Sequence, residues 1–234
     1  MESYIEFLNR INSFQKSELV LDNSNFNPNA SVFSKVDDNN KFSLFYGDTV
    51  VFELSSNLKK SIAEIVDKLY EYAPECFCDR LVSNTFHMTL HDLSNSPVLD
   101  EVSSEVFKNE INLIEKLKST PVEKQTIKMK STYIFNMVNT SLVLGLYPID
   151  ATEYTKLMNL YNIVNYVKSL PYPFTPHITL AYYNRNGFSE VSARKLEAIV
   201  NELNKNSFEI ELNTNDLVYQ KFTSMNDYTS IFTL

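Results

Sequence analysis

The sequence predicts an α+β fold built as two related lobes. Segments with helical spacing of apolar residues and segments rich in β-formers both recur along the 234 residues. The four-residue word HMTL at 87–90 returns as HITL at 177–180, although the chain has only three histidines. Each word lies on a short predicted strand that leads toward a helix. This recurrence indicates a pseudo-duplication of the lobe.

Residues 1–40 are predicted to form an N-terminal helix and an irregular extension. Between 3 and 15, Ile5, Leu8 and Ile11 have the spacing of a short amphipathic helix. The stretch 22–41 is rich in Asn, Asp and Ser, and we expect an irregular connector there.

The first lobe is predicted to contain strands and two long helices. Residues 41–54 have β-rich flanks around Gly47-Asp48, which predicts a strand-turn-strand unit. Apolar residues lie on one helical face over 57–72 and again over 99–119. The first His word lies between these two helices.

The second lobe is predicted to begin with two extended segments, 125–138 and 141–149. A helix near 151–168 leads to the second His word. A helix near 189–204 and strands near 207–220 and 227–234 complete the predicted order.

The composition excludes several classes of function. A net charge of −8 argues against a broad basic surface, so we expect no extended DNA binding and, at most, a short nucleotide or RNA end as partner. The three glycines cannot form a G-x-G-x-x-G fingerprint or a Walker loop. No G-x-S-x-G elbow is present.

The same composition bears on the cellular setting. Cys76 and Cys78 are too close for an easy disulfide, and we expect free thiols. No run of eighteen apolar residues occurs, and the first residues lack a basic start leading into an apolar run. We therefore expect a soluble, cytoplasmic, monomeric protein without a membrane partner.

Each His word places a His and a Thr on one face of the predicted strand and two apolar side chains on the opposite face. On a strand, side chains two apart share a face and stand about 6.6 Å apart, so His87 lies beside Thr89 and His177 beside Thr179. An imidazole can donate or accept a proton near neutral pH, and a hydroxyl can donate a hydrogen bond to a phosphate oxygen. Two such words facing each other could supply the base and the acid that cleave a phosphodiester.

In this pattern, FHMTLHDL and PHITLAYY resemble the paired H-x-T motifs of the 2H phosphoesterase superfamily, which includes RNA 2′,5′-ligase-like proteins and cyclic phosphodiesterases. The resemblance covers 41–234 by element order and implies a bilobal domain in which two antiparallel sheets flank a central cleft, with helices outside. It also implies metal-independent action on 2′,3′-cyclic phosphates, 2′–5′ linkages or related nucleotides, without a cofactor. The implied catalytic set is His87, Thr89, His177 and Thr179.

Three further residues are candidates for substrate binding. His91 shares the predicted face of His87, Tyr183 continues the face of His177 where a base could stack, and Lys130 could contact phosphate. A zinc site using His87 and His91 is disfavoured, because residues four apart on a strand are separated by about 13 Å.

Two functions therefore remain in competition. The first is a metal-independent phosphodiesterase, and the second is a module that binds a nucleotide or other phosphorylated ligand without turnover. Two complete words favour the enzyme, because a binder needs no pair of proton-transfer groups. Neither the exact nucleotide nor the identity of the base follows from the sequence.

Overall fold

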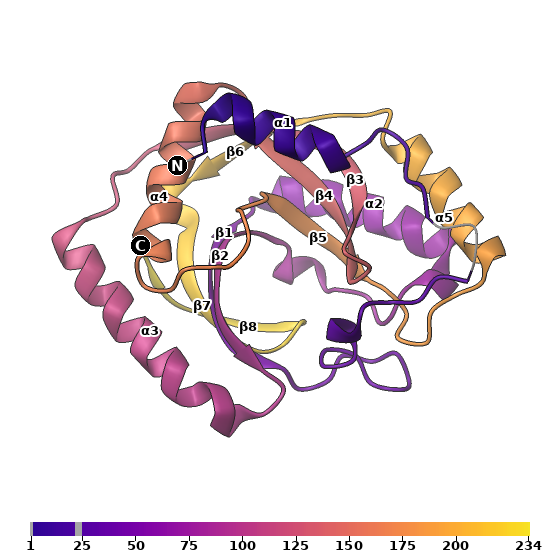
Figure 1. Ribbon diagram of the computed structural model, residues 1–234, viewed down its shortest axis with the longest axis horizontal. Coiled ribbons are helices and arrows are strands. Elements are labelled where there is room, and N and C mark those ends of the chain that lie inside the picture. The colour runs from indigo at the N-terminus through magenta and orange to yellow at the C-terminus, as the bar shows by residue number, and fades with distance from the viewer. Residues whose placement is uncertain (1, 22–24) are drawn as a thin grey trace.

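The computed structural model describes residues 2–21 and 25–234 (Figure 1). Its helices are α1 (Tyr4–Phe14), α2 (Ser56–Tyr72), α3 (Leu99–Ser119), α4 (Ala151–Asn165) and α5 (Glu190–Leu203). Its strands are β1 (Tyr46–Glu53), β2 (His87–Ser96), β3 (Thr126–Met137), β4 (Ser141–Pro148), β5 (His177–Tyr182), β6 (Glu209–Asn213), β7 (Leu217–Ser224) and β8 (Asp227–Thr233). The α+β class predicted from the sequence is confirmed.

The strands form one strongly curled antiparallel sheet in the order β6-β3-β4-β5-β2-β1-β7-β8. The expectation of two separate sheets is wrong, because β2 and β5 join the two halves. They pair through Met88 and Ile178, whereas every other neighbouring pair of strands shares a longer ladder. Each half therefore contributes its His strand to the middle of the sheet.

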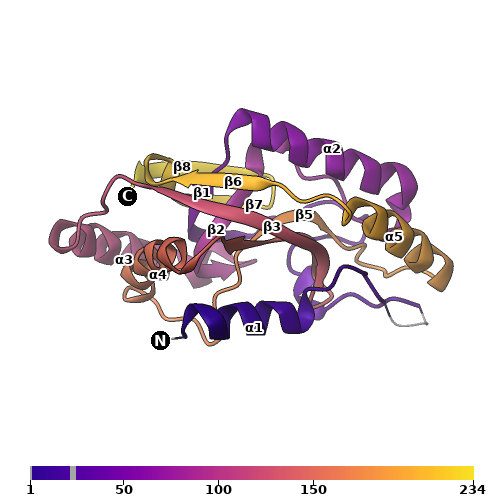
Figure 2. The same ribbon diagram turned by 90° about the horizontal axis from the view of Figure 1, so that it is seen from above.

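The two halves repeat one order of elements. In the first half β1, α2, β2 and α3 follow one another, and in the second β4, α4, β5 and α5 do so. In both, the first strand lies next to the His strand. Figure 2 shows α2 and α5 on one side of the sheet and α1, α3 and α4 on the other. The duplication inferred from the two words is thus visible in the topology.

The predicted strand-turn-strand unit at 41–54 is wrong. Gly47 and Asp48 lie inside the single strand β1 rather than in a turn. A side chain at Gly47 would come within 2.2 Å of the Ser94 carbonyl oxygen and 2.5 Å of the Phe222 ring. The glycine therefore permits close packing of β2 and β7 on β1, a role that its sequence signal does not distinguish from a turn.

The other predicted elements are present with shifted ends. The helices over 3–15, 57–72 and 99–119 and the two extended segments become α1, α2, α3, β3 and β4. The strand expected at 207–220 is divided by a 3₁₀ turn at Thr214–Asp216. The predicted connector begins at 22–24, which lies outside the described residues; the part that is described is irregular apart from isolated bridges and one short 3₁₀ turn.

Residues before 41 pack against the rest of the chain. Ser3 and Glu6 form a capping box that starts α1, and Phe7 and Ile11 bury against Tyr154 of α4. Phe26 hydrogen-bonds Phe188 through both main-chain groups, and their rings stack with centroids 4.4 Å apart. Of the helices described, none is both long and apolar enough to span a membrane.

Candidate active site

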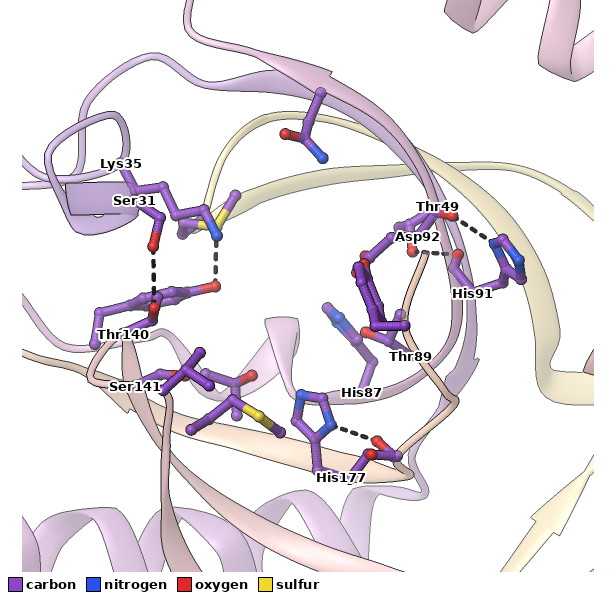
Figure 3. Close-up of a pocket in the computed structure, with 18 of the residues that line it drawn as sticks. Ser31, Lys35, Thr49, His87, Thr89, His91, Asp92, Thr140, Ser141 and His177 are labelled. Carbon is purple, nitrogen blue, oxygen red and sulfur yellow. Dashed lines mark hydrogen bonds between the residues drawn. The ribbon is translucent and has the colours of Figure 1, made fainter. Parts of the chain in front are cut away.

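A pocket of about 950 Å³ lies on the inner side of the curled sheet. His87 and Thr89 reach it from β2, and His177 and Thr179 reach it from β5. All four side chains are half-buried, as expected for groups in a pocket wall. Figure 3 shows the two imidazoles lying close together and facing the same space. The structure therefore brings together the four residues of the two words.

The register of β2 and β5 explains this convergence. Met88 and Ile178 are antiparallel partners and are fully buried, so the residues on either side of them point toward the pocket. Extending the pairing by one residue in each direction places His87 across from Thr179 and Thr89 across from His177. Each imidazole thus has two threonine neighbours, one on its own strand and one across the joint.

Both words contain a β-bulge at the same position. Opposite β1, the ladder advances from Thr89 directly to His91, so Leu90 is the extra residue of β2. Opposite β4, the ladder advances from Thr179 to Ala181, so Leu180 is the extra residue of β5. A bulge reverses which face the following residues occupy.

As a consequence, Asp92 and Tyr182 line the pocket at corresponding positions after the two words. Strict alternation would have placed His91 and Tyr183 there instead.

Main-chain hydrogen bonds orient the two imidazoles. Nδ1 of His177 lies 2.7 Å from the Thr175 carbonyl oxygen, and His87 also forms a hydrogen bond with the main chain of Thr85. A carbonyl oxygen only accepts, so Nδ1 of His177 is the donor and carries the proton. In the neutral ring, Nε2 is then left as an acceptor for a proton from a ligand.

Burial lowers the pKa of both histidines. The pKa of His87 falls to about 4, against the opposing influence of the Thr85 hydrogen bond and the Asp92 carboxylate. Burial also lowers the pKa of His177, and the Thr175 hydrogen bond and Asp92 again oppose it. Both rings are therefore neutral at pH 7 in the free protein.

The wall beside His87 carries acidic and aromatic groups. The Tyr228 ring meets the His87 ring edge-on, with centroids 5.1 Å apart. Asp92 is exposed to the pocket and is hydrogen-bonded by Tyr172, which comes from the segment before β5. Phe174, from the same segment, also lines the pocket.

Arg10 of α1 holds the segment that precedes β5. Its guanidinium donates to the Phe174 carbonyl oxygen at 2.8 Å and to the Thr175 hydroxyl at 3.2 Å. It also forms a two-pronged ion pair with Glu2 at 2.7 and 2.9 Å. Because Thr175 supplies the carbonyl that orients His177, α1 acts on the site through this segment.

The opposite side of the pocket is formed partly by the N-terminal extension. Lys35 and Ser31 reach it there, next to Thr140 and Ser141 at the start of β4 (Figure 3). The Ser31 and Thr140 hydroxyls are hydrogen-bonded at 3.0 Å. A ligand can therefore meet a cation and hydroxyl groups at a distance from the histidines.

Two of the three predicted binding residues lie away from the pocket. Tyr183 is fully buried among Phe26, Phe77 and Phe188, because the bulge at Leu180 turns it to the outer face. Lys130 pairs in register with Glu209 on the side of β3 next to the edge strand β6. Only the far end of β3, from Phe135 onward, lines the pocket.

His91 borders the pocket, but its ring points away from His87 (Figure 3). Its Nδ1 bonds the Asp92 carbonyl oxygen, and Nε2 lies 3.2 Å from the Asn165 side-chain oxygen of α4. The bulge at Leu90 is again the reason. In the described part of the chain, no three His, Cys, Asp or Glu side chains gather in a way that could hold a metal ion.

Sequence reasoning missed Lys35, Arg10, Asp92, Tyr182 and Tyr228. The first two lie in the N-terminal region that was expected to be an addition to the domain. Asp92 stands beside His91 in the sequence, and only the bulge determines which of the two side chains faces the pocket. A signal did exist at 92 and 182, since both follow the same Leu of a repeated word.

Comparison with solved structures identifies the fold. A conserved protein of unknown function from Agrobacterium tumefaciens is similar over 88% of this chain and 93% of its own, with a TM-score of 0.68 and 14% sequence identity. The chain shares the fold of this bacterial protein. No protein-family model and no curated protein sequence matches it.

Two more distant likenesses complete the comparison. Escherichia coli LigT in complex with 3′-AMP has a TM-score of 0.48 at 14% identity, covering 80% of this chain and 96% of LigT. A structure described as a phosphoesterase has a TM-score of 0.43 at 15% identity, covering 80% of this chain and 95% of that one.

Proposed function

We propose that this chain is a metal-independent phosphodiesterase of the 2H type. Its substrate would be a 2′,3′-cyclic phosphate, a 2′–5′-linked nucleotide or a cyclic oligonucleotide. The observation that carries the proposal is the pair of neutral imidazoles that face one pocket from β2 and β5. Each is flanked by threonine hydroxyls, and Nδ1 of His177 is held by a main-chain carbonyl oxygen.

The proposed reaction is a displacement at phosphorus. One imidazole takes the proton of the attacking water or ribose hydroxyl as that oxygen forms its bond to phosphorus. The other imidazole, protonated, gives its proton to the ester oxygen as the opposite P–O bond breaks. Proton count is conserved, and the two histidines exchange protonation states.

The bound phosphodiester favours protonation of the imidazole that acts as the acid. Its negative charge favours the charged form of a neighbouring imidazole and so opposes the burial that lowers the pKa of both rings. Thr89 and Thr179 then donate hydrogen bonds to the non-bridging oxygens, where charge accumulates in the transition state.

The proposal is tested with a panel of substrates and product masses. The panel holds 2′,3′-cyclic nucleotides, 2′–5′ and 3′–5′ dinucleotides and cyclic dinucleotides, and each is incubated with the wild type and with His87→Ala/His177→Ala. We expect turnover of at least one 2′,3′-cyclic, 2′–5′ or cyclic substrate by the wild type, and none above background by the double variant. Equal turnover by both proteins would trace the activity to a contaminant.

A chelation experiment tests the assignment of every role to a side chain. Turnover should survive exhaustive EDTA treatment, since no step of the scheme uses a metal ion. Loss of activity on chelation, with recovery on addition of zinc or manganese, would contradict it.

One observation favours the binding module as a second candidate. A pKa of about 4 for His87 is far from the neutral range in which proton transfer is most efficient. The binding module would be established instead if the panel shows no turnover of any member but tight binding of one nucleotide. The His87→Ala substitution should then weaken that binding.

A further inference from the structure

Lys35 is an enclosed cation in the wall of the pocket. Its ammonium lies 5.3 Å from the ring centroid of Phe45 and 5.3 Å from that of Tyr182. Burial lowers its pKa, and the Asp92 carboxylate opposes this effect. Phe45 is buried, and Tyr182 and Lys35 are half-buried, so the two rings remove the charge from water in part.

This ammonium lacks a close anionic partner. Across residues 2–21 and 25–234, no carboxylate lies within ion-pair distance of Lys35. Arg10, the other cation of the pocket, is already paired with Glu2. Contact with aromatic faces offsets only part of the cost of removing an ammonium from water.

Hydroxyl groups stand next to this charge. Ser31, Thr140 and Ser141 border the pocket on the same side as Lys35, across from the two histidines (Figure 3). Together with an ammonium, hydroxyls are the donors that bind phosphate oxygens in proteins. The pocket volume, about 950 Å³, is at the upper end of the range for small-molecule sites, roughly 300–1,000 Å³, and leaves room beyond the scissile group.

We propose that Lys35, with the Ser31 and Thr140 hydroxyls, forms a second anion subsite that binds a phosphate of the substrate other than the one that is cleaved. The preferred substrate is then a nucleotide with at least two phosphates, such as a phosphorylated or cyclic dinucleotide, rather than a nucleoside 2′,3′-cyclic monophosphate. This inference rests on the proposed function, because it assumes that the scissile phosphate lies at the histidines.

Matched dinucleotides that differ by one phosphate test the subsite. The probes are 2′–5′-linked ApA and its forms with a terminal 5′- or 2′-phosphate, pApA and ApAp. Turnover is measured as kcat/KM with the wild type. Dissociation constants are measured by calorimetry with His87→Ala/His177→Ala, which cannot cleave the probes.

The wild type should prefer at least one phosphorylated probe over ApA by about 10- to 100-fold, the contribution of a hydrogen bond to a charged group. Lys35→Met should remove this preference and leave kcat/KM for ApA nearly unchanged. Lys35→Arg, which retains the charge, should keep part of it. Lys41→Met is the matched control, because Lys41 is exposed on the same segment and does not line the pocket.

The remaining outcomes either overturn the subsite or separate it from the proposed catalysis. A preference that persists in Lys35→Met, or that is absent in the wild type, overturns the subsite. An equal loss of turnover for ApA and the phosphorylated probes would place Lys35 at the scissile phosphate and also overturn it. If no probe is cleaved but Lys35-dependent preference remains in the dissociation constants, the subsite stands and the proposed catalysis fails.

Discussion

At the scale of single residues, the two histidines share a pocket but differ in their neighbours. His87 meets the Tyr228 ring, and the positive charge of Lys59, joined by that of His177 when it is protonated, also disfavours its protonation. His177 lies on the segment held by Arg10. In the proposed mechanism, the same side chain therefore serves two roles, and only its surroundings distinguish them.

Removing either histidine should lower kcat by about 10²–10⁴-fold, the usual effect of losing a positioned proton-transfer group. The two losses should not add, because the base and the acid act in one displacement. His87→Ala/His177→Ala should be little worse than the poorer single variant. The measurement is kcat of the three variants, with folding checked by circular dichroism.

His91→Ala is the matched control for this set, because the His91 ring is bound to α4 on the outer side of the strand. A loss of kcat as large as that of His87→Ala, in a folded protein, would contradict the assignment of roles.

The pH dependence of kcat/KM should be a bell with its maximum below about pH 6.5. One imidazole must be neutral and the other protonated, and burial lowers the pKa of both from the ordinary value of 6.5, to about 4 for His87. The maximum lies between the two apparent values of the free protein. The profile of kcat should lie at higher pH, because the bound phosphodiester raises both values. A maximum of kcat/KM above pH 7 would contradict the scheme.

At the scale of elements, α1 is coupled to β5, the strand that carries His177. Arg10 binds the Phe174 carbonyl oxygen and the Thr175 hydroxyl, and the Thr175 carbonyl oxygen orients His177. The helix thus fixes a segment that has no regular structure of its own. Without it, the imidazole would keep its strand position but lose a fixed ring orientation.

Arg10→Met should lower kcat about tenfold with a small change in KM for the substrate, because misplacing a catalytic group affects the transition state more than binding. Arg10→Lys should restore part of the loss. The control is Arg194→Met, which breaks an exposed ion pair with Glu190 on α5. If Arg10→Met lowers kcat no more than this control, α1 does not position His177.

The order of elements and the four word residues could be predicted from the sequence, because hydrophobic periodicity and a repeated motif are local signals. The sequence could not predict which side of the sheet the side chains after each word occupy. A bulge depends on how two strands pair, and Leu90 and Leu180 look like ordinary strand residues. This single cause turned the side chains of Asp92 and Tyr182 toward the pocket and turned the His91 ring and Tyr183 away from it.

The role of Lys35 was hidden for a different reason. It lies in a stretch rich in Asn and Asp that reads as a connector, and it reaches the pocket only through the folding of that stretch over the sheet. The joining of the two halves into a single sheet could not be predicted from the sequence either, because it depends on one residue pair between distant strands.

At the scale of the whole molecule, a buried carboxylate links β1, β2 and α3 to β7, a strand from the C-terminal part of the chain. Asp48 of β1 accepts hydrogen bonds from the Ser94 main chain at 2.8 Å, the Asn109 amide at 3.1 and 3.2 Å, and the Tyr219 hydroxyl at 3.0 Å. These groups come from β2, α3 and β7. Burial nevertheless raises the pKa of Asp48 to about 6.

This raised pKa predicts a pH-dependent term in stability. The folded state binds the proton more tightly than the unfolded state, so the contribution is fully present below the unfolded value of 3.8 and is lost as pH rises through about 6. Between pH 4 and pH 7.5, Asp48 should lower the free energy of unfolding by about 2–3 kcal/mol.

Asp48→Asn should remove this term. Urea denaturation of both proteins across the same pH range measures it, and the difference between them should favour the wild type more at pH 4 than at pH 7.5. The histidines act equally in both proteins and cancel from the difference. A difference that does not change with pH would contradict the raised pKa.

The two words of the pocket also bear on the direction in which a substrate binds. A pocket made from two copies of one motif has an approximate two-fold axis, and so has a phosphodiester with its two ester oxygens. Perfect symmetry would allow two opposite orientations of equal free energy, and one of them would present the wrong oxygen to the acid. Under the proposed function, the Asp92 carboxylate and the Tyr182 phenol would remove this degeneracy, because a negative charge at only one of two equivalent positions repels one orientation more than the other. If the proposed reaction takes place here, a difference at one pair of equivalent positions is thus enough to fix which ester oxygen of the substrate faces the acid.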